Sequence, residues 1–154
     1  FVAVIGRHGQ KRKPFVGVLK GSGLRRGAYG TTVAHDSHNL VVAGTNPADM
    51  LSAARTLEEC GGGLCLVVDG QVIAKVELPI AGLMVAKPIE ELGPKVEAFS
   101  KKVNEMGVSV GRRSPAMALS SLALTVVPEI RISDLGLVDV KEQKLIPLFC
   151  DEHE

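Results

Sequence analysis

Thr31-Thr32-Val33-Ala34-His35-Asp36-Ser37-His38-Asn39 is the stretch that decides how this chain folds. It places two histidines, an aspartate, a serine and an asparagine within five positions. Apolar residues typical of strands flank it on both sides, at 28–33 and 40–43. A polar cluster between two buried runs must satisfy its hydrogen bonds internally or meet a ligand. The sequence therefore predicts two strands joined by a polar turn, with the rest of the chain as its scaffold.

Before this turn, residues 1–5 and 15–19 are short apolar runs typical of buried strands. The loop between them, residues 6–14, is rich in Arg and Lys. We expect the two strands to form a hairpin. Phosphate binding by the basic loop is an alternative, but a solvated hairpin tip is the simpler interpretation because no acidic or phosphate partner is implied.

After the turn, Asn46-Pro47 begins a helix and Ser114-Pro115 begins another, because Asn and Ser cap helices and Pro fits the first helical position. The glycine triplet at 61–63 ends that helix, and Asp69-Gly70 predicts a tight hairpin. We expect residues 79–84 to form an apolar loop that is buried or at an interface. The remaining predicted elements are helices at 47–59, 88–106 (with a break or kink at Gly93-Pro94) and 116–124, and strands at 64–68, 71–78, 130–133, 137–140 and 145–149. The sequence thus predicts a single α/β (α+β) domain, a mixed β-sheet packed with about three helices.

Composition excludes several classes of function. The net charge is +1 and aromatic residues make up 3% of the chain, so we expect neither nucleic-acid nor membrane binding. The three cysteines, Cys60, Cys65 and Cys150, lack zinc spacing and indicate reduced thiols in a cytoplasmic protein. The chain begins at Phe1 inside a strand-like run, which suggests a piece cut from a longer chain.

The polar turn holds metal-binding residue types, but their spacing is ambiguous. On an extended strand His35 and His38 would point to opposite faces, whereas in a tight turn they would converge. The chain has no HxH, HExxH or paired CxxC motif, and no fourth ligand is evident. From the residues alone we expect no metal site, and hydrogen bonds from Asp36 and Ser37 within the turn. A catalytic triad is disfavoured, because adjacent side chains diverge and Ser37 lacks a nucleophile elbow.

Several blocks of the sequence, taken in order, form a specific combination. They are Arg7-His8, Val33-Ala34-His35-Asp36-Ser37-His38-Asn39-Leu40, Gly61-Gly62-Gly63, Leu78-Pro79-Ile80-Ala81-Gly82-Leu83-Met84, Leu122-Ala123-Leu124, Val127-Pro128-Glu129 and Gly136-Leu137-Val138-Asp139-Val140. Together they resemble the C-terminal domain of the bacterial and archaeal adenine deaminases, over nearly the whole chain.

The resemblance implies an enzyme of the amidohydrolase superfamily that hydrolyses adenine to hypoxanthine and ammonia in purine metabolism. In such enzymes, metal ions held in a (β/α)8 barrel activate a water molecule. Residues 1–154 would then be the C-terminal domain of that enzyme, a fragment without the barrel. By the same resemblance we expect no cofactor in this fragment and manganese or iron in the parent barrel. The expected partners are the barrel of the same protein, adenine and further copies of the protein in a homo-oligomer.

The resemblance also implies roles for the polar residues. His35, Asp36 and His38 would be catalytic, and Ser37, Asn39, Arg7 and His8 would bind substrate. We expect this block to face the barrel mouth, where the domain completes or covers the active site, and we expect the isolated domain to be inactive. Two alternatives stay open: a subunit-assembly module that does not touch substrate, and a stand-alone ligand-binding domain.

Overall fold

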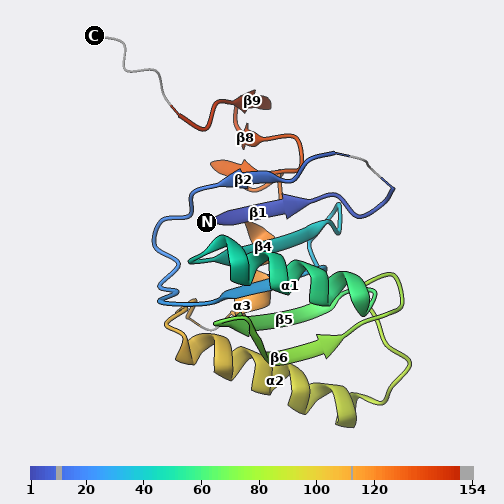
Figure 1. The fold of residues 1–154 in the computed structure, drawn as a ribbon. Helices are drawn as coiled ribbons and strands as arrows, with labels where there is room; N and C mark the ends of the chain where they lie inside the picture. The colour runs from blue at the N-terminus through green and yellow to red at the C-terminus, as the bar shows by residue number, and fades with distance from the viewer. Residues whose placement is uncertain (10–11, 112, 150–154) are drawn as a thin grey trace.

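The computed structural model describes residues 1–9, 12–111 and 113–149 (Figure 1). In chain order its elements are strands β1 (Val2–Ile5), β2 (Phe15–Gly17), β3 (Ala28–Thr31) and β4 (Leu40–Gly44), helix α1 (Pro47–Glu59), strands β5 (Gly63–Val68) and β6 (Gln71–Glu77), helices α2 (Ile89–Glu105) and α3 (Pro115–Ser121), and strands β7 (Ile130–Ile132), β8 (Leu137–Asp139) and β9 (Lys144–Ile146). The predicted class, strands and about three helices in one small domain, is confirmed.

The strands form a six-stranded sheet in the order β2-β1-β4-β3-β5-β6 and a three-stranded sheet in the order β7-β8-β9. Every pairing in both sheets is antiparallel, so the expectation of a mixed sheet is wrong. The reason lies in the connection through α1. This helix leads from β4 to β5, but β3 lies between these two strands and runs opposite to both.

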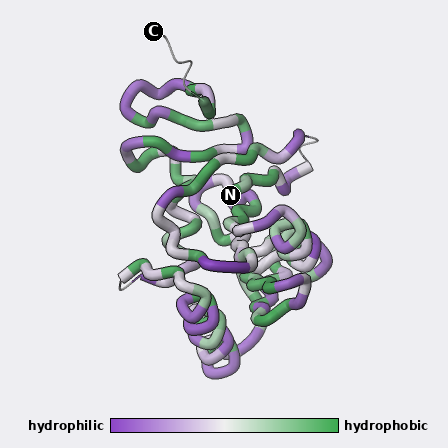
Figure 2. The backbone as a smooth tube through the Cα atoms, turned by 60° about the vertical axis from the view of Figure 1, so that its left-hand side comes forward, coloured by the Kyte–Doolittle hydropathy of each residue, from purple (hydrophilic) through white to green (hydrophobic). Residues whose placement is uncertain are grey.

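The six-stranded sheet is covered on both faces (Figure 1). On one face α1 packs Ala53 and Leu57 against strand residues that include Val42 and Val67. On the other face α2 and α3 contribute Phe99, Val103, Ala116 and Leu119 to a larger core, together with Val4, Val41, Leu64 and Leu66 from the strands. Hydrophilic residues line much of the course of α2, which packs one side on the sheet (Figure 2).

The predicted helix starts are confirmed by their caps. Asn46 Oδ1 accepts a hydrogen bond of 2.8 Å from the Asp49 N–H, and Ser114 Oγ accepts one of 3.1 Å from the Met117 N–H. The break or kink expected at Gly93-Pro94 does not interrupt α2, which runs through Pro94 to Glu105. Pro94 is the sixth residue of α2, so its missing N–H removes one intrahelical bond, the one to the carbonyl of Glu90, and the helix continues past it.

The predicted hairpins are also present. β1 pairs with β2, and β5 pairs with β6 through Asp69 and Gly70, both of which have positive φ angles (52° and 76°). That geometry is the one a two-residue hairpin requires. Gly61 (φ 78°) follows α1, as the glycine triplet predicts.

The loop at 79–84 differs from its expected burial. The side chains of Ile80 and Met84 are 45% and 58% exposed, so these parts of the loop are not buried, and this exposure does not test the expected role of the loop at an interface.

The cysteines that the structure describes are free thiols. Cys65 is buried and Cys60 is half-buried, while Cys150 lies outside the described residues. Burial raises the pKa of Cys65 to about 11. In the described ranges, no helix combines the length and apolar character that crossing a bilayer requires.

Candidate functional site

One edge of the six-stranded sheet collects the segments that the sequence singles out. β1 and β3 end at this edge, and β4 and β5 begin there, because the register places Ile5 opposite Leu40 and Thr31 opposite Leu64. β6 also ends there, with Glu77 opposite Gly63. The basic pair after β1, the polar turn after β3, the glycine triplet before β5 and the loop after β6 are therefore neighbours in space.

The polar turn is compact rather than extended. The His38 N–H donates to the carbonyl of Ala34 (2.6 Å), and the Asn39 N–H lies 3.4 Å from Ser37 Oγ. The rings of His35 and His38 approach to 5.4 Å between centroids, tilted by 57°. The two histidines thus converge, which resolves the ambiguity of their spacing. His35, Asp36 and Ser37 are exposed and His38 is half-buried.

Arg7 and His8 are attached to this turn. The Arg7 main-chain N–H donates to Asn39 Oδ1 (3.3 Å), and Arg7 Nη1 donates to the carbonyl of His38 (2.9 Å). His8 Nε2 lies 3.0 Å from the carbonyl oxygen of Ser37. A carbonyl can only accept, so Nε2 carries the proton in this contact. The structure therefore brings together all the residues to which the resemblance assigns roles.

Asn39 differs from the others because its side chain is buried, with 4% of its surface exposed. Its Nδ2 donates to Asp134 Oδ1 (3.3 Å), and the other oxygen of Asp134 pairs with Arg12 at 3.2 Å. Asp134 lies in the turn between β7 and β8, so the small sheet is connected to the polar turn through this carboxylate. In the isolated chain the Asn39 amide is thus occupied by a protein partner.

The loop at 79–84 contacts segments of the site that its residues did not predict. Arg7 Nη2 donates to the carbonyl of Ala81 (3.1 Å), and Thr32 Oγ1 donates to the carbonyl of Gly82 (2.6 Å). Thr32 Oγ1 also accepts from the Gly63 N–H (2.7 Å). The matching sequence block at 78–84 was a signal that this loop matters, but nothing in its residues indicated which segment it would contact.

The imidazole of His38 lies in a basic environment. Burial lowers its pKa, and the neighbouring His35 and Arg7 lower it further, whereas Asp36 raises it. His38 is therefore mainly neutral at neutral pH, with one ring nitrogen free to accept a hydrogen bond. Its Nδ1 is buried and has no hydrogen-bond partner among the described residues. A buried polar atom without a partner is uncommon and marks a position that a ligand or another chain can satisfy.

The residues at this edge do not fit a metal ion. Across residues 1–9, 12–111 and 113–149, no group of three or more His, Cys, Asp and Glu side chains lies close enough to hold one. Two converging histidines and one exposed carboxylate are residue types able to form hydrogen bonds and to exchange protons, but they do not make a closed coordination shell.

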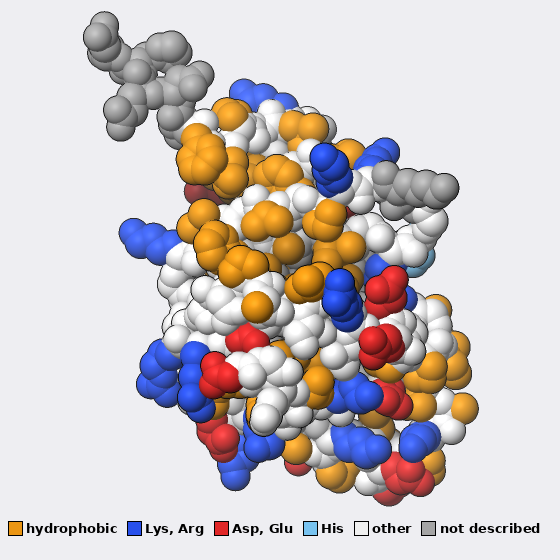
Figure 3. Space-filling model, in the orientation of Figure 1, with side chains coloured by type: hydrophobic (Ala, Val, Ile, Leu, Met, Phe, Trp, Pro, Cys, Tyr) orange, Lys and Arg blue, Asp and Glu red, His pale blue; other side chains and the backbone are white. Residues whose placement is uncertain are grey.

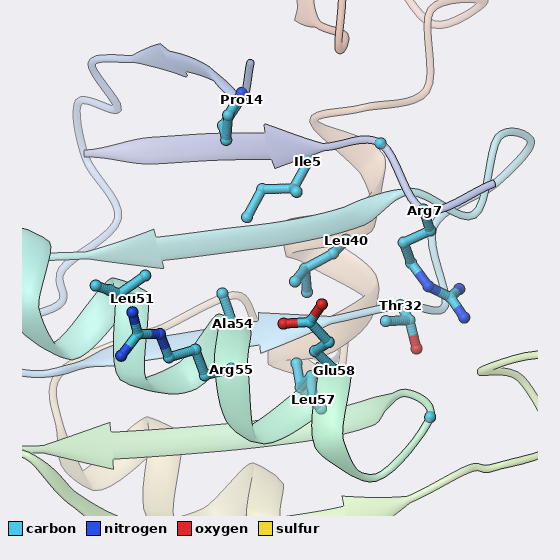
Figure 4. Close-up of a pocket in the computed structure, with 12 residues that line it drawn as sticks. Ile5, Arg7, Pro14, Thr32, Leu40, Leu51, Ala54, Arg55, Leu57 and Glu58 are labelled. Atoms are coloured by element: carbon cyan, nitrogen blue, oxygen red, sulfur yellow. The ribbon is translucent and has the colours of Figure 1, made fainter. Parts of the chain in front are cut away.

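A cleft of about 470 Å³ lies beside the edge, between α1 and strands β1 and β4 (Figure 4). Apolar side chains form its walls, with Ile5 and Leu40 opposite Ala54 of α1. Arg55 and Glu58 of α1 add charges. Among the residues to which the resemblance assigns roles, Arg7 lines this cleft. His35 and His38 lie on the neighbouring polar turn, so the cleft and the histidine pair are distinct parts of one edge.

Comparisons with known proteins agree with this combination of segments. The family model for the adenine deaminase C-terminal domain matches residues 1–144. Proteins named adenine deaminase are similar to the chain: one from Dehalococcoides mccartyi is 47% identical over 146 residues, and one from Clostridium botulinum is 46% identical over 149 residues. The matches cover 95% and 97% of this chain but 25% and 24% of those proteins, so the chain spans about a quarter of its relatives' length. The chain belongs to the adenine deaminase C-terminal domain family.

Proposed function

We propose that this chain acts as the C-terminal domain of an adenine deaminase that hydrolyses adenine to hypoxanthine and ammonia. In this proposal the polar edge of the six-stranded sheet completes or covers the active site of a barrel in the same protein. Manganese or iron in that barrel would supply the activated water when bound. We place the protein in the cytoplasm, as a homo-oligomer.

One observation carries the proposal: the polar turn, the Arg7-His8 pair and the 79–84 loop, far apart in sequence, meet at a single edge. The structure leaves His35 and Asp36 exposed there, although their flanking strands are buried. Exposed groups on a rigid scaffold are available to a substrate or to the barrel without refolding the domain.

The chemistry of this edge suits a purine that loses an amino group. A purine ring presents hydrogen-bond acceptors, and the departing amine needs a proton. Neutral His38 accepts or donates a hydrogen bond, and Asp36 in its ionised form accepts one. His35 lies beside both and is a residue type suited to proton transfer near neutral pH. We assign these three residues to substrate orientation and proton transfer, and Ser37 and His8 to substrate contacts at the rim.

The test is ammonia release from adenine by the full-length protein of which this chain is proposed to be a part. Removing residues 1–154 should abolish turnover, and adding the separately purified chain in trans should restore part of it. Full turnover by the truncated protein in its folded, metal-loaded state would refute a role at the active site. Absence of adenine turnover by the intact protein, with another aminopurine accepted, would correct the substrate.

Assembly is a second candidate, and a specific surface favours it. Apolar side chains gather over β1, β2 and the small sheet, on the part of the α1 side of the molecule that α1 itself does not cover (Figure 3). Val16 in β2, Val18 just after it and Leu145 in β9 are among the exposed apolar residues. Large exposed apolar patches mark contacts with other chains or domains. Light scattering on Val16→Ser/Val18→Ser protein tests this candidate, since a smaller oligomer with unchanged turnover per active site would favour assembly.

A further inference from the structure

We propose that Arg7 is a positioning residue whose guanidinium holds the polar turn and the 79–84 loop together as one rigid substrate-facing edge. This inference rests on the proposed function for its catalytic consequence, although its structural part stands on the geometry of the chain. It replaces direct substrate contact as the main task of the Arg7 side chain.

The two carbonyl groups that accept hydrogen bonds from the Arg7 guanidinium belong to residues with an unusual backbone conformation. Nη1 donates to the carbonyl of His38 at 2.9 Å and Nη2 to the carbonyl of Ala81 at 3.1 Å. Both acceptor residues are non-glycine residues with positive φ, 49° for His38 and 56° for Ala81. Side chains disfavour this conformation, which persists where the surroundings hold it. A single charged fork therefore holds one strained residue in each of two segments that lie 43 positions apart in sequence.

The guanidinium of Arg7 lies close to the main chain at two glycines, Gly82 and Gly62. A Cβ added at Gly82 would lie 2.6 Å from Arg7 Cζ, and one added at Gly62 would lie 2.6 Å from Gly82 Cα and 2.8 Å from Thr32 Oγ1. The guanidinium plane thus packs directly on main chain. This close approach explains why the glycine triplet and the glycine of the 79–84 loop belong to the same site.

Lysine does not substitute for this arrangement. The guanidinium is planar and directs two N–H groups along fixed, diverging directions, whereas an ammonium is a compact point charge on a flexible stem. Burial lowers the pKa of Arg7, but a guanidinium stays protonated at any physiological pH, so the fork keeps all its donors. Charge and fork geometry are therefore separable by mutation.

The first experiment measures amide hydrogen exchange on the 154-residue chain carrying Arg7→Lys or Arg7→Gln. Both variants should exchange about tenfold or more faster than wild type at 34–39 and also at 79–85. The reporting amides include His38, which donates to Ala34, and Met84, which donates to Ile80. Arg25→Gln is the matched control, because Arg25 Nη2 also donates to a carbonyl, that of Glu105, in another part of the molecule. It should leave both segments unchanged.

The second experiment follows the His38 imidazole by NMR titration, with His38→Gln to assign its signal. Four groups act on its charge: His35, Arg7 and His8 lower the pKa of His38, and Asp36 raises it. Arg7→Gln should raise the pKa of His38, because one positive charge is lost. Arg7→Lys should leave that pKa near its wild-type value while exchange still accelerates, which a general loss of stability would not produce.

Unchanged exchange in either segment in folded Arg7→Lys protein overturns the proposal. If Arg7→Gln fails to fold, Arg7→Lys alone decides the test. In the full-length protein, Arg7→Lys should lower kcat more than it raises KM, as expected for misplaced groups. If the intact protein does not turn over adenine but hydrogen exchange still accelerates in the Arg7 variants, the proposed function is refuted and the positioning role of Arg7 stands.

Discussion

The carboxylate of Asp49 accepts a hydrogen bond of 2.7 Å from the main-chain N–H of Gly70, which ties the first turn of α1 to the tip of the β5–β6 hairpin. The same carboxylate accepts from the Asp69 N–H (3.3 Å) and from Asn46 Nδ2 (2.8 Å), and the residue is 2% exposed. A buried carboxylate with three donors is a structural group whose removal leaves those donors unpaired.

Asp49→Ala should therefore lower the free energy of unfolding by about 1–3 kcal/mol, the usual cost of leaving buried donors unpaired. Urea unfolding followed by circular dichroism measures it. Glu59→Ala is the control on the same helix, since Glu59 is exposed, and it should change stability by less than about 0.5 kcal/mol. Equal effects of the two substitutions would contradict the assignment.

The stabilising effect of Asp49 should depend on pH. Burial alone would raise the pKa of Asp49, but the hydrogen bonds from Asn46, Gly70 and Asp69 outweigh burial and lower it. The folded state then takes up the proton less readily than the unfolded state. The contribution is full above the unfolded value of about 4 and is lost as pH falls through the lower folded value. The stability gap between wild type and Asp49→Ala should shrink in that window, and a gap constant from neutral pH into acid would refute this.

Gly82→Ala should be more damaging than Gly21→Ala. Both glycines have positive φ, 73° and 80°, so both substitutions carry the backbone cost of about 1–2 kcal/mol. A Cβ at Gly21 meets open space, whereas one at Gly82 meets the Arg7 guanidinium. The difference between the two variants in thermal unfolding isolates that contact. Matching melting temperatures would mean that the loop shifts freely away from Arg7.

His35→Ala and Asp36→Ala, in the full-length protein, should each lower kcat by more than tenfold, about 1.4 kcal/mol of transition-state stabilisation. Both side chains are exposed, so the melting temperature should stay close to wild type. Kinetics and calorimetry on the same preparations separate the two effects, with Glu97→Ala as an exposed control on α2. Wild-type turnover in either folded variant would show that the turn is only structural.

The isolated 154-residue chain should release no ammonia from adenine, even with added manganese or ferrous iron. Its polar edge offers proton-transfer groups but no cluster of three metal-ligating side chains within the described residues. A coupled ammonia assay against a heat-inactivated sample checks this. Turnover clearly above that background would mean that the edge is catalytic by itself.

Local signals predicted most of the fold. Asn46 and Ser114 cap their helices, and Asp69-Gly70 forms its hairpin, because each depends on a few neighbouring residues. Strand direction was not predictable in this way. The insertion of β3 between β4 and β5 is a pairing between distant segments, and an alternation of strand and helix suggests a parallel unit until that pairing is known.

The site was predictable in its members but not in its connections. The polar turn and Arg7-His8 were identified from residue type and resemblance. The contact of Arg7 with Ala81, and that of Asn39 with Asp134, join positions 74 and 95 residues apart. Contacts between segments this far apart leave no periodic pattern in a sequence, and the acceptor in Ala81 is a main-chain carbonyl, which any residue supplies.

The small sheet buries little apolar surface, so we expect it to open before the rest of the domain. Within β7, β8 and β9, which the structure describes completely, Ile132 is the one buried residue. Segments with so little buried apolar surface open locally at free energies well below that of global unfolding. Opening of this unit would release the Asp134 carboxylate from Asn39 and Arg12 while the six-stranded sheet stays intact. The polar edge should then respond to mild heat or denaturant before the domain melts, and if this edge serves an active site as proposed, loss of activity should precede global unfolding.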